Sequence, residues 1–381
     1  MRLVLIPDKF KGSLTAEEVR SAIAAGVREV FPDAELMGFP ASDGGDGFLE
    51  TVRAVREVET VHVAVEDPLG REIRAPYLMD AVRGEAFIEM ARASGMELLT
   101  DAERDPLQTH TRGTGQLIRH AIRGGARSVY VGLGGSATND GGCGIATVFG
   151  YRFLDREGLE LAPTGGNLDK IARITEPEDP LLRHEVEVIA VNDVSNPLWG
   201  PEGAAFVYAR QKGASDAAIA FLDKGLRRLD RLVSEQLGIQ AGTLAGAGAA
   251  GGTAFGLHCF LGARYISGTQ YVLGLTGVED YLNKHRVDFI CTGEGRIDSQ
   301  TLSGKLIQGV LALGKRLEVP VIAVCGKSEV PLQELRSHGF KAVLAVSDPE
   351  KPLSYNMEQA APLTRQAVRG YFEGIKTDGN H

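Results

Sequence analysis

Short runs of apolar and β-branched residues alternate along this chain with longer segments in which apolar residues recur every three to four positions. The runs that are almost entirely apolar are residues 3–6, 128–131, 186–191, 287–291, 319–324 and 342–346. Such runs are typical of strands that are covered on both faces, as strands of parallel sheets are. The alternation therefore predicts an α/β fold built on parallel strands.

The clearest helix is predicted over residues 16–30. Ile23 and Val27 lie on one apolar face of this segment, and Thr15 with Glu18 forms a capping box at its start. Similar apolar periods predict further helices over residues 216–237, 303–317 and 356–372.

Two regions depart from the strand–helix alternation. Residues 60–91 alternate apolar and polar positions between the turns DPLG and AVRG, which predicts an antiparallel meander. Residues 151–252 are irregular, with a hairpin-like segment YRFLDREGLEL and the loop AGTLAGAGAAGG. The C-terminal third alternates cleanly again, and we expect it to pack beside the N-terminal strand.

The domains are therefore expected to be discontinuous in sequence. Residues 1–59 with 286–381 are predicted to form a Rossmann- or flavodoxin-like domain with parallel strands, to which part of 105–150 could belong. Residues 60–285 are predicted to form a second, mixed α/β domain that carries the meander and a glycine-rich loop. A length of 381 residues suits two such domains.

Charge and cysteine content narrow the class of protein. The formal net charge is −9 and we find no basic run, which argues against a nucleic-acid-binding surface. The first apolar stretch ends at Asp8 and is too short for a signal peptide or a membrane span, and the four cysteines are far apart. We therefore expect a cytoplasmic protein with reduced thiols, a monomer or a homodimer, that binds neither nucleic acid nor membranes.

Acidic residues follow several predicted strands. In chain order, these residues are Asp8, Asp43, Asp46, Asp193, Glu294 and Asp298. Because ligands of open α/β sheets bind beyond the carboxyl ends of the strands, we expect these acids to share one crevice. Mg²⁺ suits such a crevice, since it takes one or two carboxylates together with water and phosphate oxygens. The alternative for each acid is a helix cap or a turn residue.

The 48 glycines cluster at the ends of apolar runs. The densest cluster, GLGGSATNDGG, covers residues 132–142 directly after the strand predicted at 128–131. Backbone amides in such a turn form an anion site without a cationic side chain, and Ser136 and Thr138 add hydroxyl groups. We interpret this loop as a phosphate cradle.

Known motifs fit this loop to different degrees. A Walker A loop is excluded because the only GKS of the chain, at residues 326–328, has Val321 where the first glycine of that motif belongs. A nucleophile elbow is excluded because Thr138 stands where its last glycine belongs. The dinucleotide fingerprint is closer, since its pattern is matched by Gly132, Gly134, Ala137 and Asp155. The following NDGG is typical of continued loop, with a helix only afterwards. A NAD-dependent oxidoreductase stays an alternative function.

The motifs taken together match a known family. The chain resembles the type I glycerate kinase family in the order and spacing of DKFKGS, SDGGDG, GLGGSATNDGG, NDVSNPLWGPEGAAFVYARQKGA, GAAGG and TGEGRIDSQTLSGK. The resemblance implies ATP- and Mg²⁺-dependent phosphorylation of D-glycerate, with a flavodoxin-like and a second α/β domain flanking an active-site cleft. Bacterial members favour 2-phosphoglycerate over 3-phosphoglycerate. The chain departs from the family pattern at Lys9, Ser42, Asp46, Phe48 and Arg210, which could tune substrate choice.

Phosphoryl transfer needs positioning, neutralisation of the moving phosphate and a group that takes the alcohol proton. We predict Asp193 as the general base and Lys11 as a cation facing a carboxylate or phosphate. Substrate binding is predicted for Asp8, Asp43, Gly44, Gly45 and Lys212. Nucleotide binding is predicted for Gly134, Gly135, Ser136, Asn139, Asp140 and Lys305, and Mg²⁺ binding for Glu294 and Asp298.

Several of these roles have structural alternatives. Asp193 could be a local Asx-turn residue, Lys11 a solvated surface side chain, and Asp140 a magnesium contact or a helix cap. For the whole chain, a non-catalytic nucleotide-binding protein with this fold is a third hypothesis.

Overall fold

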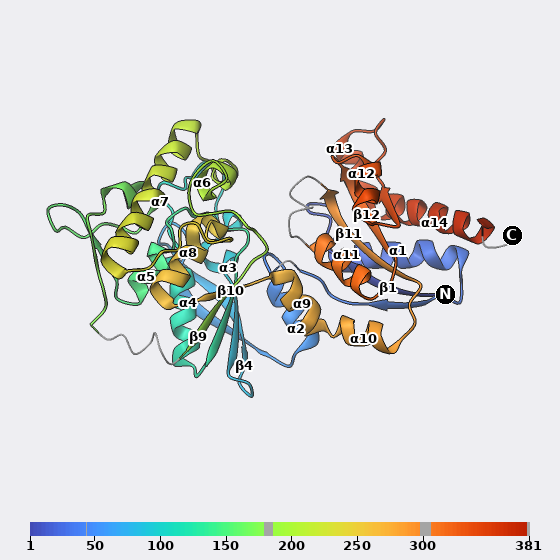
Figure 1. Cartoon of the computed structure of the whole chain (residues 1–381), viewed down its shortest axis with the longest axis horizontal. Helices are drawn as coiled ribbons and strands as arrows, with labels where there is room; N and C mark the ends of the chain where they lie inside the picture. The colour runs from blue at the N-terminus through green and yellow to red at the C-terminus, as the bar shows by residue number, and fades with distance from the viewer. Residues whose placement is uncertain (43, 179–185, 298–305, 379–381) are drawn as a thin grey trace. The chain divides into compact units, whose positions relative to one another are not determined.

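The computed structural model describes residues 1–42, 44–178, 186–297 and 306–378 (Figure 1). The chain forms two compact units, Met1–Ser42 with Thr269–His381 and Asp43–Gly268. Relative to the predicted domains, residues 44–59 belong to the second unit and residues 269–285 to the first. The predictions for Asp43, Asp298 and Lys305 lie outside the described residues.

The first unit is built on a five-stranded sheet in the order β13-β12-β11-β1-β2. All neighbouring strands in it are parallel. The strands are β1 (Arg2–Pro7), β2 (Glu35–Gly38), β11 (Phe289–Ile297), β12 (Val321–Ser328) and β13 (Ala342–Ala345). The helices are α1 (Ala16–Val30), α9 (Gly268–Thr276), α10 (Val278–Lys284), α11 (Leu306–Arg316), α12 (Leu332–Ser337), α13 (Leu353–Glu358) and α14 (Ala360–Asp378).

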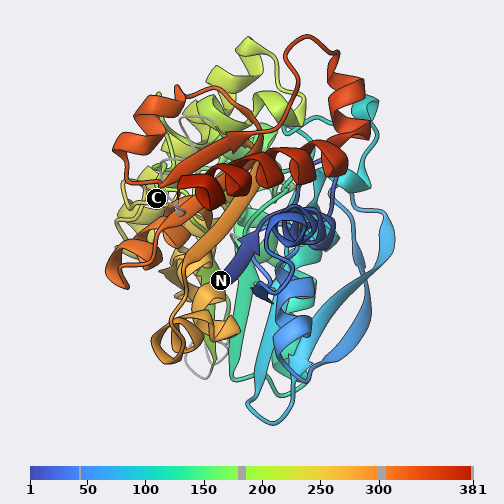
Figure 2. The same cartoon turned by 90° about the vertical axis from the view of Figure 1, so that its right-hand side faces the viewer.

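Strand β1 explains why the sequence runs are apolar throughout. Leu3 and Leu5 are buried in a core formed with α1 and α14, which lie over one face of the sheet (Figure 2). Val4 and Ile6 point the other way, into a second core formed with α10 and α11. Because side chains alternate along a strand, covering both faces requires apolar residues at every position. The prediction of covered, parallel strands is confirmed here.

The predicted helix over residues 16–30 is confirmed to the residue. The Thr15 side chain accepts from the amide of Glu18, and the Glu18 carboxylate accepts from the amide of Thr15. The single helix predicted over 356–372 is wrong, because the chain forms α13 and α14 with a break at Gln359. Pro362 lies in the first turn of α14, where its missing N–H is tolerated, whereas within a continuous helix it would break the hydrogen-bond ladder.

The second unit is built on a six-stranded sheet in the order β10-β9-β6-β5-β4-β3. Strands β3 to β5 pair antiparallel, which confirms the predicted meander, and β5, β6, β9 and β10 run parallel. The strands are β3 (Glu59–Glu66), β4 (Glu72–Asp80), β5 (Glu85–Glu89), β6 (Ser128–Gly132), β9 (Glu187–Val191) and β10 (Arg264–Ile266).

The helices of this unit are α2 (Phe48–Val55), α3 (Ala91–Ser94), α4 (Arg112–Arg123), α5 (Cys143–Val148), α6 (Ala204–Tyr208), α7 (Asp216–Leu237) and α8 (Ala249–Leu261). Short 3₁₀ helices are η1 (Met96–Leu98), η2 (Asp101–Glu103), η3 (Gly165–Lys170) and η5 (Arg210–Lys212). The helix predicted over 216–237 is confirmed, with Ser215 as its N-cap. The hairpin-like segment does turn back on itself, with an antiparallel bridge between Leu154 and Glu160, and its β7 (Arg152–Leu154) also pairs antiparallel with β8 (Arg173–Thr175).

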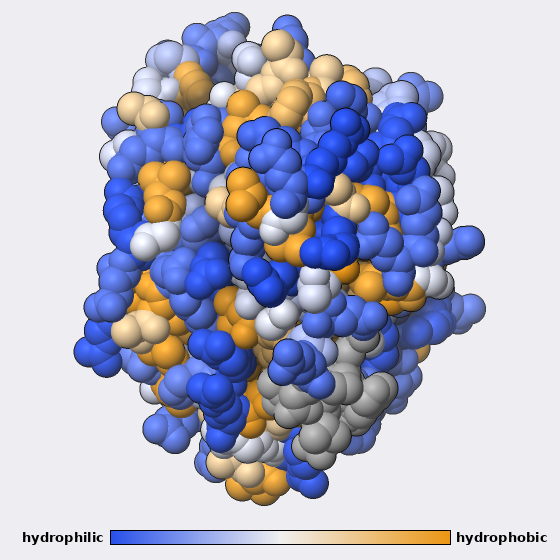
Figure 3. Space-filling model, turned by 90° about the vertical axis from the view of Figure 1, so that its left-hand side faces the viewer, coloured by the Kyte–Doolittle hydropathy of each residue, from blue (hydrophilic) through white to orange (hydrophobic). Residues whose placement is uncertain are grey.

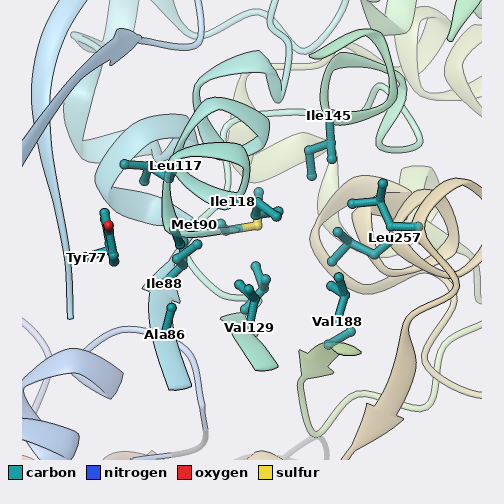
Figure 4. Packing of buried hydrophobic residues seen from close by; sticks show 14 of the residues in the cluster. Tyr77, Ala86, Ile88, Met90, Leu117, Ile118, Val129, Ile145, Val188 and Leu257 are labelled. Carbon is teal, nitrogen blue, oxygen red and sulfur yellow. The ribbon is translucent and has the colours of Figure 1, made fainter. Parts of the chain in front are cut away.

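One core of the second unit lies between the sheet and its helices. Figure 4 shows apolar side chains of β5, β6 and β9 meeting those of α4, α5 and α8, among them Ile88, Val129, Val188, Leu117, Ile145 and Leu257. On the other face of the sheet, Phe87 stacks on Tyr130 and meets Phe48 of α2 edge-on. The middle of the sheet is thus covered on both sides.

The surface drawn in Figure 3 is mainly hydrophilic, and the cysteines are not paired in disulfides. Hydrophilic residues predominate on the face drawn in Figure 3, and apolar residues there form separate groups. No helix within the described ranges is long and apolar enough to cross a bilayer. The four cysteines are buried free thiols.

Candidate functional site

The parallel strands of the second unit end along one edge of its sheet. Glu89 ends β5, Gly132 ends β6, Asp193 follows β9 and Ser267 follows β10. Glu89 and Gly132 are direct neighbours in register. Ligands of α/β sheets bind at such an edge, so it is the first place to look for a site.

Two glycine loops approach each other at this edge. A Cβ atom on Gly132 would lie 2.4 Å from the carbonyl oxygen of Gly44, and one on Gly134 would lie 2.6 Å from Cα of Gly45. Gly44 also has a positive φ of 82°, which favours glycine. The glycines therefore let the loop that was predicted to bind substrate pack directly against the loop that was predicted to bind nucleotide.

The glycine-rich loop is held firmly by backbone bonds. The amide of Leu133 donates to Val191 at 3.0 Å, and the amide of Ala137 donates to Ser94 at 2.9 Å. The Thr109 hydroxyl donates to the carbonyl of Ala137 at 2.8 Å. Since these amides are used inside the protein, the part of the loop that faces outward is Gly134, which is half-buried, and Gly135, which is exposed.

Asp140 joins the starts of two helices. Its buried carboxylate accepts hydrogen bonds from the amide and hydroxyl of Thr111, before α4, and from the amides of Gly142 and Gly144, at the start of α5. Burial raises the pKa of Asp140 despite these bonds, which act to lower it. Both carboxylate oxygens are thus engaged by the protein itself, and α5 begins only at Cys143, after NDGG, as predicted.

Lys212 reaches the glycine-rich loop from η5. Its ammonium group donates to the Ser136 hydroxyl at 2.8 Å and to the Thr138 carbonyl at 2.7 Å, and its side chain is 2% exposed. Burial lowers the pKa of Lys212 to about 7, while the charge of Asp140 acts to raise it. An anion that binds beside such a lysine favours its charged form and so raises its pKa again.

Polar atoms next to Lys212 are buried without a partner among the described residues. The Asn139 side-chain amide oxygen and nitrogen and the Thr138 hydroxyl make no hydrogen bond there, although both residues are fully buried. Buried polar groups are normally satisfied, by water or a ligand where no protein group serves. Gly251 allows the backbone after Ala249 to pack onto this segment, since its Cβ would lie 2.0 Å from the Thr138 carbonyl.

Asp193 is half-buried directly beyond β9. The hydroxyl of Ser267, which follows the neighbouring β10, donates to Asp193 Oδ1 at 2.6 Å. The carboxylate is therefore oriented from another strand of the same edge. Such an oriented carboxylate can accept a proton from a hydroxyl group placed beside it.

The predicted residues of the first unit gather at its own topological switch point. The winding of the sheet reverses between β1 and β11, where the Asp8 amide donates to the Gly293 carbonyl at 2.8 Å. The loop after β1 packs onto β11, because a Cβ on Gly295 would lie 3.1 Å from the amide nitrogen of Lys11. Lys11 is exposed and Glu294 is half-buried.

Sequence reasoning missed Glu89, which is a buried acid at the edge. It is 1% exposed, and burial raises its pKa to about 7, while Arg92 acts to lower it. The rule that acids follow strands would have found it at the end of EAFIE, but that segment was interpreted only as part of the meander. The contact of Lys212 with Ser136 carries no sequence signal, since it joins residues 76 positions apart.

The positions that depart from the family pattern have different surroundings. Ser42 and Phe48 are buried, Lys9 and Asp46 are half-buried, and Arg210 is exposed and paired with Asp216. Arg210 is thus a surface residue of η5, two positions from the buried Lys212.

The geometry around Asp155 does not favour a dinucleotide site. Asp155 lies in the turn after β7, where its Oδ1 accepts from the amides of Glu157 and Leu159, each at 2.9 Å. A fingerprint acid binds ribose hydroxyls from the end of a strand beside the glycine turn. The short α5 also begins eleven positions beyond Gly132, the first glycine of the loop, and the residues between them are loop as far as Gly142.

The two units thus define an α/β protein with glycine-lined loops at the carboxyl ends of parallel strands, backed in the second unit by a buried lysine. The model of the glycerate kinase family matches residues 3–376. The chain therefore belongs to the glycerate kinase family, which confirms the resemblance of its motifs and the predicted enzyme class.

Similar proteins cover almost the whole chain. A glycerate kinase of Halalkalibacterium halodurans is 40% identical over 368 residues, which are 96% of each chain. The glycerate 2-kinase of Escherichia coli K12 is 40% identical over 347 residues, 91% of this chain and 90% of that protein. A crystal structure assigned to a glycerate kinase 2 of Salmonella typhimurium LT2 is 38% identical, with a TM-score of 0.79 over the full length of both chains.

Proposed function

We propose that the protein transfers the γ-phosphoryl group of ATP to the 2-hydroxyl group of D-glycerate, in the cytoplasm and with Mg²⁺. The observation that carries this proposal is the buried ammonium group of Lys212 on Ser136 and Thr138, within a glycine loop at the edge of parallel strands. Substrate and nucleotide are both anions in this reaction. A buried cation and the accessible backbone of the glycine loop are the groups that would hold them.

The contacts of the second unit support a division of roles. Gly134, Gly135 and Ser136 are proposed to hold phosphate oxygens, and Gly44 and Gly45, which pack against them, to hold glycerate. Asp193 is proposed as the base that takes the proton of the attacking hydroxyl, because Ser267 orients its carboxylate. Lys212 would then neutralise the charge of the anion that binds beside Ser136.

Among the described residues, no group of three or more histidines, cysteines or acids is arranged to hold a metal ion. This suits Mg²⁺, which usually takes only one or two protein carboxylates and completes its shell with phosphate oxygens and water. Glu294, a half-buried residue of the first unit, is kept as a proposed ligand of this kind, whereas Asp140 is engaged by four protein donors. When bound, Mg²⁺ would neutralise charge on the transferred phosphate. Lys11 of the first unit is kept as a proposed cation that faces a carboxylate or a phosphate.

Phosphorus NMR of the reaction product tests the proposal. Purified protein is mixed with ATP and D-glycerate, with and without MgCl₂, and the expected product with the metal is 2-phosphoglycerate. The E. coli relative named a glycerate 2-kinase supports this position over the 3-hydroxyl. A signal of 3-phosphoglycerate would correct the position, and no ADP under saturating conditions would refute the function.

Replacement of single residues tests the proposed roles. Asp193→Asn is expected to lower kcat by at least about 100-fold, as is typical for loss of a general base. Asp101→Asn is a matched control, because Asp101 is a surface carboxylate with 92% of its side chain exposed. Equal activity of the two variants would remove Asp193 from the mechanism.

A further inference from the structure

Glu89 links three elements at the edge of the second sheet. It ends β5 next to Gly132, and its Oε2 accepts a long hydrogen bond of 3.4 Å from the amide of Leu49 in the first turn of α2. Its Oε1 lies 3.4 Å from Nε of Arg92, at the start of α3. The carboxylate itself is 1% exposed, so it meets protein groups rather than solvent.

Helix α2 needs an acceptor at this end. Its N-cap is Gly47, with a φ of 90°, so the helix has no side-chain cap of its own. The first amides of a helix have no acceptor within the helix, and a carboxylate near them is favoured by the helix dipole. Glu89 supplies this carboxylate from a different strand.

The start of α2 determines where the preceding loop lies. Residues 44–47 lead directly into α2. Gly132 packs against Gly44, and Gly134 packs against Gly45, so closely that neither position has room for a Cβ atom. A shift of α2 by a few tenths of an ångström would therefore move this loop against the glycine-rich loop. Glu89 connects the two loops, since it belongs to β5, the strand next to Gly132, and accepts a hydrogen bond from α2, which follows residues 44–47.

We propose that Glu89 is a positioning residue, which holds residues 44–47 in place for substrate binding through α2 and does not itself touch the substrate. The proposal rests on the proposed function, in which this loop binds glycerate. The groups that face Glu89 are the guanidinium of Arg92, the carboxylates of Glu50 and Asp46, and the amide of Leu49.

The charge of Glu89 changes in the neutral range of pH. Burial, together with the charges of Glu50 and Asp46, raises its pKa to about 7, while Arg92 and the Leu49 amide favour the ionised form. The ionised carboxylate binds Leu49 and Arg92 more strongly than the neutral acid. The hold on α2 is thus expected to be firm above about pH 7 and weaker below it.

Glu89→Gln tests the proposal, because glutamine keeps the shape and loses the charge. The Michaelis constant for D-glycerate is measured from pH 6 to pH 8.5 in the wild type and the variant. Their ratio is expected to be near one at pH 6 and to rise to roughly 3–10 at pH 8, with kcat changed less than about twofold. Glu235→Gln is the control, since Glu235 lies on α7 with 59% of its side chain exposed and is not among the groups that face Glu89, so its ratio should stay flat.

A ratio for Glu89→Gln that is the same at every pH would overturn the proposal, because a purely structural defect has no reason to follow this titration. Glu89→Asp gives a second reading should the glutamine variant not fold. The shorter carboxylate keeps its charge but withdraws from Leu49, so the Michaelis constant should rise throughout the pH range.

Hydrogen exchange separates this proposal from the proposed function. If the wild type does not phosphorylate glycerate, the function fails, but amide exchange in residues 44–50 still reports on the hold of Glu89. Exchange in Glu89→Gln should be faster than in the wild type at pH 8 and similar at pH 6. Equal exchange at both pH values would refute a positioning role.

Discussion

Replacing Lys212 with methionine is expected to change how stability depends on pH. In the unfolded chain this lysine has its usual pKa of 10.5, whereas in the folded protein burial lowers the pKa to about 7. At 1.36 kcal/mol for each pKa unit, the difference corresponds to roughly 5 kcal/mol at neutral pH. Methionine has a similar length and carries no charge, so the variant lacks the free-energy penalty of burying a charged group at this position.

The sign follows from proton binding. Between pH 7 and 10.5 the unfolded chain holds a proton on Lys212 that the folded protein has released, so the stability of the wild type rises with pH in this window. From pH 7 to pH 9 the gain from this group is roughly 2 to 3 kcal/mol. The methionine variant lacks this gain. It also leaves Ser136 and Thr138 without their donor, at about 1 to 3 kcal/mol each, so its stability at pH 7 should differ little from that of the wild type.

Urea denaturation at pH 7 and pH 9 measures this difference. The free energy of unfolding of the wild type minus that of Lys212→Met should be roughly 2 to 3 kcal/mol larger at pH 9 than at pH 7. Lys224→Met is the matched control, because Lys224 lies on the surface of α7 with 70% of its side chain exposed. If the difference in free energy of unfolding between the wild type and Lys212→Met is the same at both pH values, the lysine is not buried as described. Kinase activity of Lys212→Met should be lost under all conditions.

Other residues give sharp tests of the local geometry. Asp140→Asn puts an amide donor among four donors and should cost about 2–4 kcal/mol of stability in urea denaturation, so an unchanged midpoint would contradict its role as a joint. Gly134→Ala forces a Cβ to within 2.6 Å of the backbone of Gly45 and should raise the Michaelis constant for glycerate, whereas Gly274→Ala, in open space, should leave it unaltered. Thr15→Ala removes the capping box of α1 and should cost about 1 kcal/mol without changing activity, as thermal unfolding and an activity assay can show.

Local signals in the sequence were enough for most of the fold. Helices α1 and α7 were predicted to the residue, because each has a long apolar period and a side chain that caps its start. The parallel strands were found because burial on both faces leaves almost no polar position in them. The break between α13 and α14 was missed, since the apolar period continues across Gln359 and only Pro362 marks the change.

The candidate site was less accessible to sequence reasoning. Acids and glycines at strand ends could be found, because the carboxyl edge of a parallel sheet is fixed by strand direction alone. The contact between Lys212 and Ser136 could not, since it depends on how η5 packs against a loop far away in the chain. Close packing of Gly44 against Gly132 likewise follows from tertiary structure, although the glycines themselves were visible.

Two buried groups of opposite charge flank the glycine-rich loop, and both have a pKa of about 7. Burial lowers the pKa of the lysine and raises the pKa of the acid, because it favours the neutral form of each. An anion that binds beside Lys212 raises its pKa, so the protein must take up a fraction of a proton when substrate binds near neutral pH. Calorimetry in two buffers of different ionisation enthalpy measures that uptake, which Lys212→Met should abolish and Glu89→Gln should retain. Uptake that persists in Lys212→Met would place the titrating group elsewhere and remove the main support for this lysine as the cation of the site.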